Sequence, residues 1–317
     1  MSRRRNRPDA RDLHGILLLD KPLGMSSNKA LQIAMAILRA AKGGHTGALD
    51  PLATGLLPLC FGEATKLAGN LLGSRKAYVA ECRLGVTTTT ADLEGEIVER
   101  RPVPTLDEVA IEAALATLRG RIVQVPPVYS ALKQDGEPLY LKARRGEVVE
   151  VPPREVEIDR LELVSRTEDT LTLHVECGSG TYIRSLAVDL GEKLGCGAHL
   201  SSLRRLWVEP FRAPVMVSLD ELREAAGQGS EAEDGLVLPV SAGVADFPAL
   251  QLDAVASQAV SQGRQIDWPA DRRAERSAAF DSDGRLLALV DCDEQGRIRI
   301  LRGFNLPSQS PSGRGPG

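Results

Sequence analysis

Residues 43–55 read GGHTGALDPLATG, and this glycine-rich stretch sets the interpretation of the whole chain. Its only carboxylate, Asp50, is followed by Pro51, which biases the aspartate away from helical backbone angles. Glycines on both sides permit unusual dihedral angles and the close approach of another molecule. The stretch is therefore a turn or extended loop. It is either an ordinary Asp-Pro turn or a loop that presents Asp50 to a bulky substrate.

Two common nucleotide-binding motifs do not fit this loop. No Gly-Lys-Ser/Thr follows at Walker spacing, and the G-x-G-x-x-G fingerprint is missing. The five cysteines lie far apart, form no C-x-x-C pair and do not cluster with the four histidines. We therefore expect reduced thiols and no metal site, and no nucleoside triphosphate is implied.

The bulk composition is typical of a soluble globular protein. The chain has 317 residues, of which 43% are hydrophobic and 26% charged, enough for a large domain and a small one. No apolar run approaches the ~18 residues that span a bilayer, and the apolar patch near the N-terminus is too short for a signal peptide. We expect a cytoplasmic protein without a membrane partner.

Charge is unevenly distributed along the chain. The net charge of −4 argues against a nucleic-acid partner, but the first 45 residues carry nine basic and three acidic side chains. Residues 217–317 carry 10 basic and 16 acidic side chains. Because a polyanion is bound by a local basic face, the overall acidity weakens an RNA-binding hypothesis without removing it.

Hydrophobic periodicity predicts both strands and helices in the first part of the chain. Residues 15–27, GILLLDKPLGMSS, are typical of a short buried strand that enters a Pro-Gly turn. Ser26 or Ser27 then caps a helix. Residues 76–85 alternate between apolar and polar side chains, as a strand does.

The middle of the chain combines a helix with a projecting insertion. Residues 105–120 predict a helix that begins with a capping box, Thr105 with Glu108 three residues later. The proline- and glycine-rich residues 124–152 resemble an insertion, with a small helix around residues 138–145.

A change of composition marks the C-terminal part. Residues 217–240 include the small, polar and acidic GQGSEAEDG, which favours a boundary. Beyond it, three short strands are joined by turns at Asp283-Gly284 and Gln295-Gly296. Since strands and helices alternate without a strict βαβ rhythm, the sequence predicts an α+β fold with a mixed, largely antiparallel sheet and flanking helices.

A second glycine-rich site contains two candidate functional residues. In CGSGTYIRSL, Tyr182 and Arg184 are expected at the end of a strand, where positions i and i+2 point to the same face. Each also has an ordinary interpretation, Tyr182 as a half-buried core aromatic and Arg184 as a surface charge. Tyr78 could equally belong to the core, and His45 could hydrogen-bond its own loop.

Several longer motifs resemble those of one known family. GILLLDKPLGMSS, GHTGALDPLATGLLP, GEATK, YSALK, GTYIRSL and LGCGAHLSSLRRL together resemble the bacterial tRNA pseudouridine-55 synthases, the TruB family. The resemblance runs from about residue 15 to 305. It implies a pseudouridine synthase fold with an RNA-gripping insertion and a small, β-rich, PUA-like C-terminal domain.

The same resemblance implies a reaction and its residues. Uracil at position 55 of the tRNA T-loop is detached from its ribose, rotated and rejoined through carbon, without a cofactor or metal. Asp50 matches the nucleophile, and a carboxylate can form a covalent adduct that divides one hard step into easier ones. Arg184 would pair with Asp50 and keep it ionised.

Five further residues take substrate-binding roles from the resemblance. Tyr78 would stack on the extruded base, and Tyr182 and Leu203 would line the pocket. Lys21 would support the active-site face. His45 would enter the RNA and fill the space of the flipped nucleotide, whose extrusion costs about a few kcal/mol.

The expected domain boundaries follow from the motifs and the composition. They are a disordered N-terminus at residues 1–12, a catalytic domain at 13–216 with its insertion at about 124–152, a linker at 217–240, a PUA-like domain at 241–305 and a disordered tail at 306–317. The basic residues expected to grip RNA in the insertion are Lys133, Lys142, Arg144 and Arg145.

Departures and alternatives accompany this interpretation. Thr89 stands where the family usually has an acid, while Asp92 matches, and we expect the change to be tolerated. We expect a monomer whose partner is the T-stem-loop of tRNA. A non-catalytic RNA-binding or RNA-folding protein and a metabolic enzyme with a small-molecule pocket are the alternatives.

Overall fold

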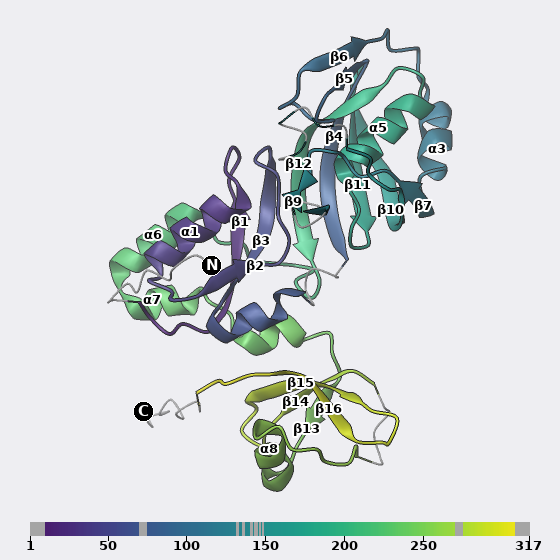
Figure 1. Cartoon of the computed structure of the whole chain (residues 1–317). Helices are drawn as coiled ribbons and strands as arrows, with labels where there is room; N and C mark the ends of the chain where they lie inside the picture. Colours follow the sequence, from purple (N-terminus) through teal and green to yellow (C-terminus); the bar gives the residue numbers. More distant parts are fainter. Residues whose placement is uncertain are drawn as a thin grey trace.

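The computed structural model describes residues 10–69, 75–130, 149–269 and 275–307, together with residues 133, 134, 137–139, 142, 145 and 147. Figure 1 shows a large body of strands and helices and a smaller body that contains the last four strands. No helix in the described part of the chain is long and apolar enough to cross a membrane.

One mixed sheet of eight strands forms the framework of the large body, and its pairs are antiparallel except between β12 and β3. In spatial order the strands of its main path are β1 (Gly15–Lys21), β3 (Ala53–Phe61), β12 (Ala198–Val208), β4 (Lys76–Leu84), β11 (Thr170–Cys177), β10 (Arg154–Arg166) and β7 (Gly120–Gln124). The short β2 (Gly43–His45) pairs with β3. The predicted largely antiparallel α+β fold is confirmed.

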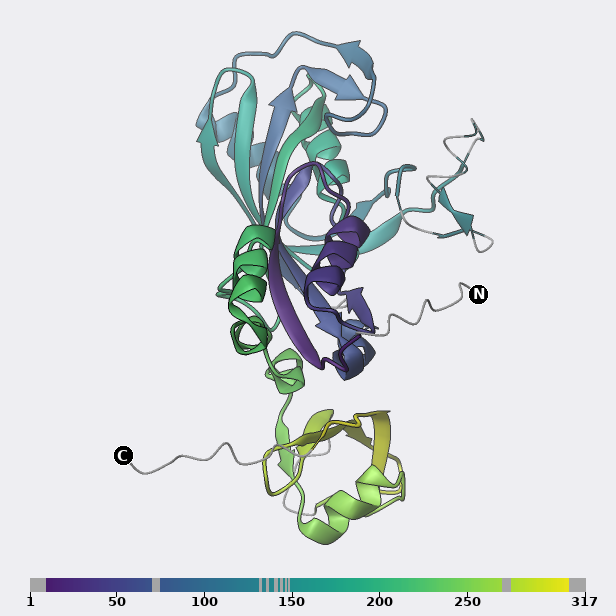
Figure 2. The ribbon, with the colours of Figure 1, turned by 90° about the vertical axis from the view of Figure 1, so that its left-hand side faces the viewer.

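The first five residues of β1 are apolar because both faces of the strand are buried there. Leu17 and Leu19 pack with α1 (Ser27–Ile37) and α6 (Leu219–Gln228), which lie on either side of β1 in the view of Figure 2. Ile16 and Leu18 point the other way. They share a cluster with the 3₁₀ helices η1 (Gly62–Leu67) and η2 (Val240–Val244) and with apolar side chains of the smaller body.

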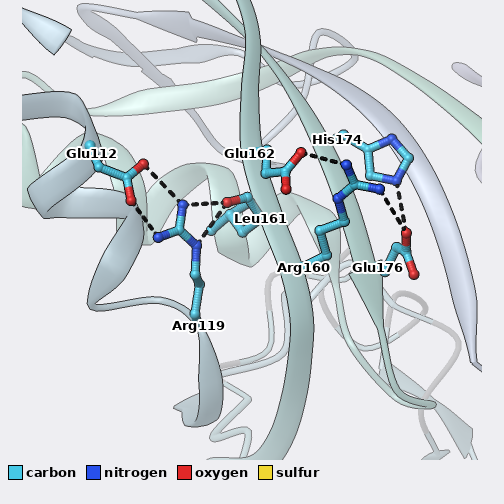
Figure 3. Close-up of polar contacts among 7 residues, drawn as sticks. All are labelled: Glu112, Arg119, Arg160, Leu161, Glu162, His174 and Glu176. Carbon is cyan, nitrogen blue, oxygen red and sulfur yellow. Dashed lines mark hydrogen bonds and ion pairs between the residues drawn. The ribbon is translucent and has the colours of Figure 1, made fainter.

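A second core lies at the other end of the sheet, where α3 (Glu108–Ala116) and α5 (Ile183–Lys193) pack against it. Arg119 fastens this layer, as Figure 3 shows. Its guanidinium pairs with Glu112 and donates two hydrogen bonds to the Leu161 carbonyl oxygen, 2.6 and 2.9 Å long. A separate polar network on β10 and β11 joins Arg160, Glu162, His174 and Glu176.

The start of α3 differs from the sequence prediction. Its N-cap is Asp107, whose carboxylate accepts from the Ala110 amide over 2.7 Å, so the predicted capping box at Thr105 and Glu108 is wrong. Aspartate satisfies the free amides of a first turn as well as threonine does. The prediction chose the wrong one of two competing caps. At α1 the cap is Ser26, and Ser27 is the first helical residue.

Residues 217–240, expected as a linker, form α6 and α7 (Ser230–Gly235) in the structure. A capping box of Ser218 and Glu221 begins α6, whose apolar side packs on α1. The acidic residues that suggested a linker pair with the N-terminal segment, since Arg11 lies 2.7 Å from Glu233 and 2.6 Å from Asp234. The segment is therefore part of the large body.

The smaller body has its own sheet, β13 (Ala249–Gln251), β14 (Ser277–Phe280), β15 (Leu286–Cys292) and β16 (Ile298–Gly303), with α8 (Ala254–Ser261) beside it. The two predicted turns join β14 to β15 and β15 to β16. Gly284 and Gly296 adopt φ angles of 77° and 72°, which explains their identity. The β-rich C-terminal domain is confirmed.

The predicted insertion is described only in part. Within it, two short strands, β8 (Lys133–Gln134) and β9 (Glu137–Pro138), form a pair. A separate pair, β5 (Val86–Thr88) and β6 (Ile97–Arg100), lies before the insertion in the chain. Half of the predicted small helix around residues 138–145 lies outside the described residues. Of the expected disordered ends, residues 1–12 and 306–317, only residues 10–12, 306 and 307 are described. The exact domain boundaries remain a prediction.

Candidate active site

The loop that carries Asp50 joins β2 to β3 and is fixed on both sides of the aspartate. Ser27 Oγ donates to the Leu49 carbonyl oxygen (3.0 Å) and accepts from the Leu49 amide (2.7 Å), and this serine is buried. The Gly24 amide donates to the Pro51 carbonyl oxygen over 2.8 Å. The segment after β1 therefore sets the position of Asp50.

Arg184, in the first turn of α5, orients the Asp50 carboxylate. Its Nη2 lies 3.1 Å from Asp50 Oδ2, and its Nη1 lies 3.5 Å from Asp92 Oδ2. It also donates to the carbonyl oxygens of Thr90 and Tyr129, over 3.2 and 2.9 Å. Arg184 and Asp92 are buried, whereas 45% of the Asp50 side chain is exposed. The guanidinium holds one oxygen of Asp50 and leaves the carboxylate open to a substrate.

The surroundings of Asp50 make its ionisation sensitive to neighbouring charges. Burial raises the pKa of Asp50 above its ordinary value, Arg184 and Lys21 oppose the increase, and Asp92 adds to it. The contact with the Arg184 guanidinium favours the ionised form of the carboxylate and so opposes the effect of burial. Such a carboxylate can serve as a nucleophile or a general base.

A cavity of about 360 Å³, the inner cavity, opens beside Asp50. Its walls include four of the predicted residues, Tyr78 from β4, Leu203 from β12, and Tyr182 and Arg184 from the start of α5. Tyr78 and Leu203 are buried. The structure thus brings residues from three separate segments of the chain around Asp50.

A second cavity of about 790 Å³, the outer cavity, adjoins the first and contains His45 in its wall. The two cavities share Ala48, Leu49, Asp50, Ser130 and Arg184. His45 is half-buried at the end of β2, and burial lowers its pKa, with the charge of Arg205 adding to the effect. Its imidazole is therefore mainly neutral at neutral pH.

Arg205 forms the floor of the inner cavity and was not predicted. This buried guanidinium donates to the carbonyl oxygens of Leu56 (2.7 Å) and Gly47 (3.2 Å) and hydrogen-bonds the phenol of Tyr78. Burial raises the pKa of Tyr78 to about 12 despite this nearby charge. The tyrosine is thus held as a neutral phenol. Gly55 leaves room for the Arg205 backbone, because a Cβ there would lie 2.2 Å from its carbonyl oxygen.

Tyr182 occupies a different backbone position from the one expected. It is the N-cap of α5, and Arg184 lies within the helix, so the prediction that both stand at the end of a strand is wrong. Gln124 fixes the turn, accepting from the Tyr182 amide (2.8 Å) and donating to its carbonyl oxygen (3.0 Å). The Arg154 guanidinium lies 4.8 Å from the centroid of the Tyr182 ring. The helix start, rather than strand alternation, directs both side chains to the cavity.

Lys21 contacts the backbone of the Asp50 loop and is not among the residues that line either cavity. Its buried ammonium donates to the carbonyl oxygens of Pro22 (2.9 Å) and Met25 (2.5 Å), and Pro51 lies 3.5 Å away. Burial lowers its pKa to about 8, and Asp50 limits the decrease. The predicted supporting role agrees with this geometry better than substrate contact does.

The segment around Thr89 forms a turn between β5 and β6 at the rim of the outer cavity. Thr89 exchanges hydrogen bonds with Glu96, its amide donating over 2.9 Å and its Oγ1 accepting over 3.1 Å. Asp92, two per cent exposed, accepts from the Thr90 hydroxyl and the Glu94 amide. No group of three or more potential metal ligands gathers among the described residues.

Comparisons with known proteins identify the family of this chain. Residues 35–183 match the family model described as TruB family pseudouridylate synthase (N terminal domain), and two C-terminal models match residues 184–245 and 247–305. A tRNA pseudouridine synthase B of Xanthomonas campestris is 58% identical over 93% of this chain and 95% of its own length. The chain belongs to the TruB family.

A second relative and a solved structure also match nearly the whole of this TruB-family chain. The tRNA pseudouridine synthase B of Stutzerimonas stutzeri is 50% identical over 92% of this chain and 97% of its own length. The crystal structure of a Cbf5-Nop10-Gar1 complex contains a chain with the same fold, at 24% identity and a TM-score of 0.73, covering 93% of this chain and 86% of that one. The enzyme is thus an isomerase, a pseudouridine synthase.

Several residues that build the TruB-family site were missed by the sequence prediction. Ser27, Gln124 and Arg205 act through buried hydrogen bonds, and Lys76 and Arg154 line the inner cavity. The sequence alone does not show which polar side chains are buried. The one signal that could have found Ser27 and Arg205 is their position inside the motifs that resemble the family.

Proposed function

We propose that the chain converts the uridine at position 55 of tRNA, in the T-loop, into pseudouridine. The proposal is supported chiefly by the Asp50–Arg184 pair, which stands where the two cavities meet. The relatives named tRNA pseudouridine synthase B support tRNA as the substrate. The reaction breaks the bond from ribose C1′ to N1 of uracil and forms one from C1′ to C5. C5 loses a proton and N1 gains one, so no oxidant is needed.

The inner cavity suits a single nucleobase. Its volume of about 360 Å³ accepts one planar ring, and Tyr78 and Leu203 offer it buried, apolar surfaces. A base inside folded RNA reaches such a cavity only after leaving its stack, at a cost of about a few kcal/mol. We therefore expect the target uridine to flip, with Tyr78 against the uracil and Tyr182 at the side of the cavity.

Asp50 is the proposed nucleophile of this reaction. Its carboxylate is the most exposed group of the Asp50–Arg184–Asp92 cluster, and Arg184 contacts only one side of it. A carboxylate held in this way attacks without first losing a partner, because the cation that stabilises it does not cover the free oxygen. Arg184 and Lys21 favour the ionised form.

His45 is proposed to fill the space that the flipped nucleotide leaves in the RNA. It stands in the wall of the outer cavity, where the body of the RNA would lie while the base occupies the inner cavity. Its imidazole is planar, and its lowered pKa favours the uncharged form that stacks between bases. Stacking offsets part of the cost of extrusion.

Mapping of pseudouridine in tRNA incubated with the protein tests the proposal. Wild type should modify the uridine at position 55, and Asp50→Asn should bind the tRNA and give no product. Asp20→Asn is a matched control, since Asp20 pairs with Arg204 (2.8 Å) and lines neither cavity. Product from the Asp50 variant would disprove the nucleophile. Modification at other positions alone would disprove the site.

We also propose a tRNA-folding role that does not depend on catalysis. The pairing of β2 with β3 holds His45 through the backbone, independently of the Asp50–Arg184 contact. In a refolding assay with misfolded tRNA, Asp50→Asn should restore aminoacylation as wild type does, and His45→Ala should not. Equal rescue by both variants would contradict a role of the histidine in folding.

The insertion is proposed to grip the T-stem. Lys142 and Arg145 are its basic residues with described side chains, and Arg145 is held by Glu137 (2.6 Å) and Glu147 (2.7 Å). Phosphate contacts make binding fall steeply with salt, so tRNA affinity should drop between two ionic strengths. A salt-independent affinity would favour a small-molecule enzyme instead.

A further inference from the structure

Among the residues that the structure describes, no group satisfies the buried hydroxyl of Ser130. The residue is 4% exposed, and its Oγ has no hydrogen-bond partner. Native structures rarely leave such groups unpaired, because a buried polar atom without a partner is destabilising. A bound substrate would explain a hydroxyl that is kept at this place without a partner.

The position of Ser130 limits which part of a substrate it can reach. It is one of the five residues that line both the inner and the outer cavity. Arg184 donates to the carbonyl oxygen of the preceding Tyr129 over 2.9 Å, and the same guanidinium holds Asp50. Ser130 therefore stands on the same rim as the carboxylate and is anchored through the same arginine.

A nucleotide that spans the two cavities places its ribose at this rim. If the base lies in the inner cavity and the polynucleotide backbone in the outer one, the sugar that joins them meets the shared residues. Within an RNA chain the O3′ and O5′ atoms of that ribose are esterified, so the 2′-hydroxyl is its one free hydroxyl. It is also the group by which proteins distinguish RNA from DNA.

The polar groups of the rim differ in what they offer to a hydroxyl. Arg184 only donates, and it already faces the two aspartates and two carbonyl oxygens. Asp50, when ionised, only accepts. Ser130 can donate and accept, so it alone of these three can complement whichever role Asp50 leaves to the 2′-hydroxyl.

We propose that the Ser130 hydroxyl hydrogen-bonds the 2′-hydroxyl of the target nucleotide and makes the site selective for ribose. The inference rests on the proposed RNA substrate. It assigns Ser130 a binding role and no proton-transfer step. Selectivity arises because a 2′-deoxy nucleotide leaves the serine hydroxyl buried without a partner, as in the free protein.

A cycle of protein and substrate changes tests the contact. Dissociation constants are measured in an Asp50→Asn background, which prevents turnover, for a T-stem-loop RNA and for the same RNA with a single 2′-deoxyuridine at the target. Ser130→Ala should weaken binding of the ribose substrate about two- to tenfold, the range of one neutral hydrogen bond, and leave the deoxy substrate unchanged.

Thr46→Val provides a matched control for the same cycle. Thr46 is fully buried, and its Oγ1 also has no partner, but it lines neither cavity. It should leave the ratio of the two dissociation constants unchanged, and thermal melting should show that each variant is folded.

Each alternative outcome overturns the proposed contact. Equal weakening of both substrates by Ser130→Ala would place the serine on the base or a phosphate, and no weakening would mean that solvent satisfies it. A changed ratio in Thr46→Val would make the effect unspecific. The proposed function itself is tested separately, by measuring pseudouridine formation by wild type and by Ser130→Ala with Asp50 intact. Absence of pseudouridine in both would contradict the proposed function and not the serine contact.

Discussion

Replacement of Ser27 by alanine should impair both stability and catalysis, although this serine carries none of the chemistry. The Ser27 hydroxyl makes two hydrogen bonds to the backbone of Leu49, the residue before Asp50. Ser27→Ala leaves the buried amide and carbonyl groups of Leu49 without hydrogen-bond partners. Ser26→Ala is the matched control, because the neighbouring Ser26 caps α1 from an exposed position.

The magnitude follows from the number of groups left without partners. Each lost hydrogen bond contributes about 0.5–1.5 kcal/mol, and an unsatisfied buried group costs about 1–3 kcal/mol. We therefore expect Ser27→Ala to lower the free energy of unfolding by about 2–4 kcal/mol. Loss of the Ser26 cap should lower it by about 1 kcal/mol. A displacement of the Asp50 loop approaching 1 Å should reduce kcat by about 10²-fold.

Urea unfolding and single-turnover pseudouridine formation measure these two effects. Both variants are assayed well below their melting temperatures, so that the fraction of folded protein does not limit the rate. Ser27→Ala should lose rate at saturating RNA, with its dissociation constant little changed. If it keeps the kcat of wild type and loses no more stability than Ser26→Ala, the serine does not position the aspartate.

Three further predictions concern the same framework. Arg184→Met removes the cation beside the buried Asp92 carboxylate. In urea titrations it should lower the free energy of unfolding by about 3 kcal/mol. A loss below about 1 kcal/mol would contradict the pairing. Burial raises the pKa of Asp50, and the nucleophile must be ionised, so kcat/KM of wild type should rise with pH through that raised pKa. The acid limb of the pH profile should therefore lie above the pKa of free aspartate. A profile that stays flat down to pH 4 would argue against this. Gly55→Ala places a Cβ 2.2 Å from the Arg205 carbonyl oxygen, at a residue whose φ is 93°. It should lower the free energy of unfolding by more than about 2 kcal/mol in thermal or urea unfolding. Gly44→Ala is the control and should be nearly neutral, because its Cβ would meet nothing within 4 Å.

The sequence predicted the fold well where local patterns and tertiary packing agree. The alternation in β4 and the glycines of the C-terminal turns express rules that act over a few residues. Residues 217–240 show the limit of such rules. Their acidic, small residues are typical of a linker, yet Glu233 and Asp234 are held by Arg11, a residue more than 200 positions away.

The candidate site was predictable in its members rather than in its geometry. The resemblance named Asp50, Tyr78, Arg184 and Leu203, and the structure places all four at one cavity. No local pattern could show that Tyr182 caps a helix, because the choice between a strand end and a helix start depends on Gln124, 58 positions earlier. Buried polar positions such as Arg205 are set by the backbone they contact, which only the folded chain reveals.

Strand β1, which is buried on both faces, links the stability of the large body to the presence of the smaller one. A truncation that ends before residue 241 would uncover Ile16 and Leu18 on the very strand whose continuation anchors the Asp50 loop. We expect the remaining fragment to expose apolar surface and to aggregate. Anyone trimming this protein for crystals or for engineering should therefore keep its last sheet, even if that sheet never touches RNA.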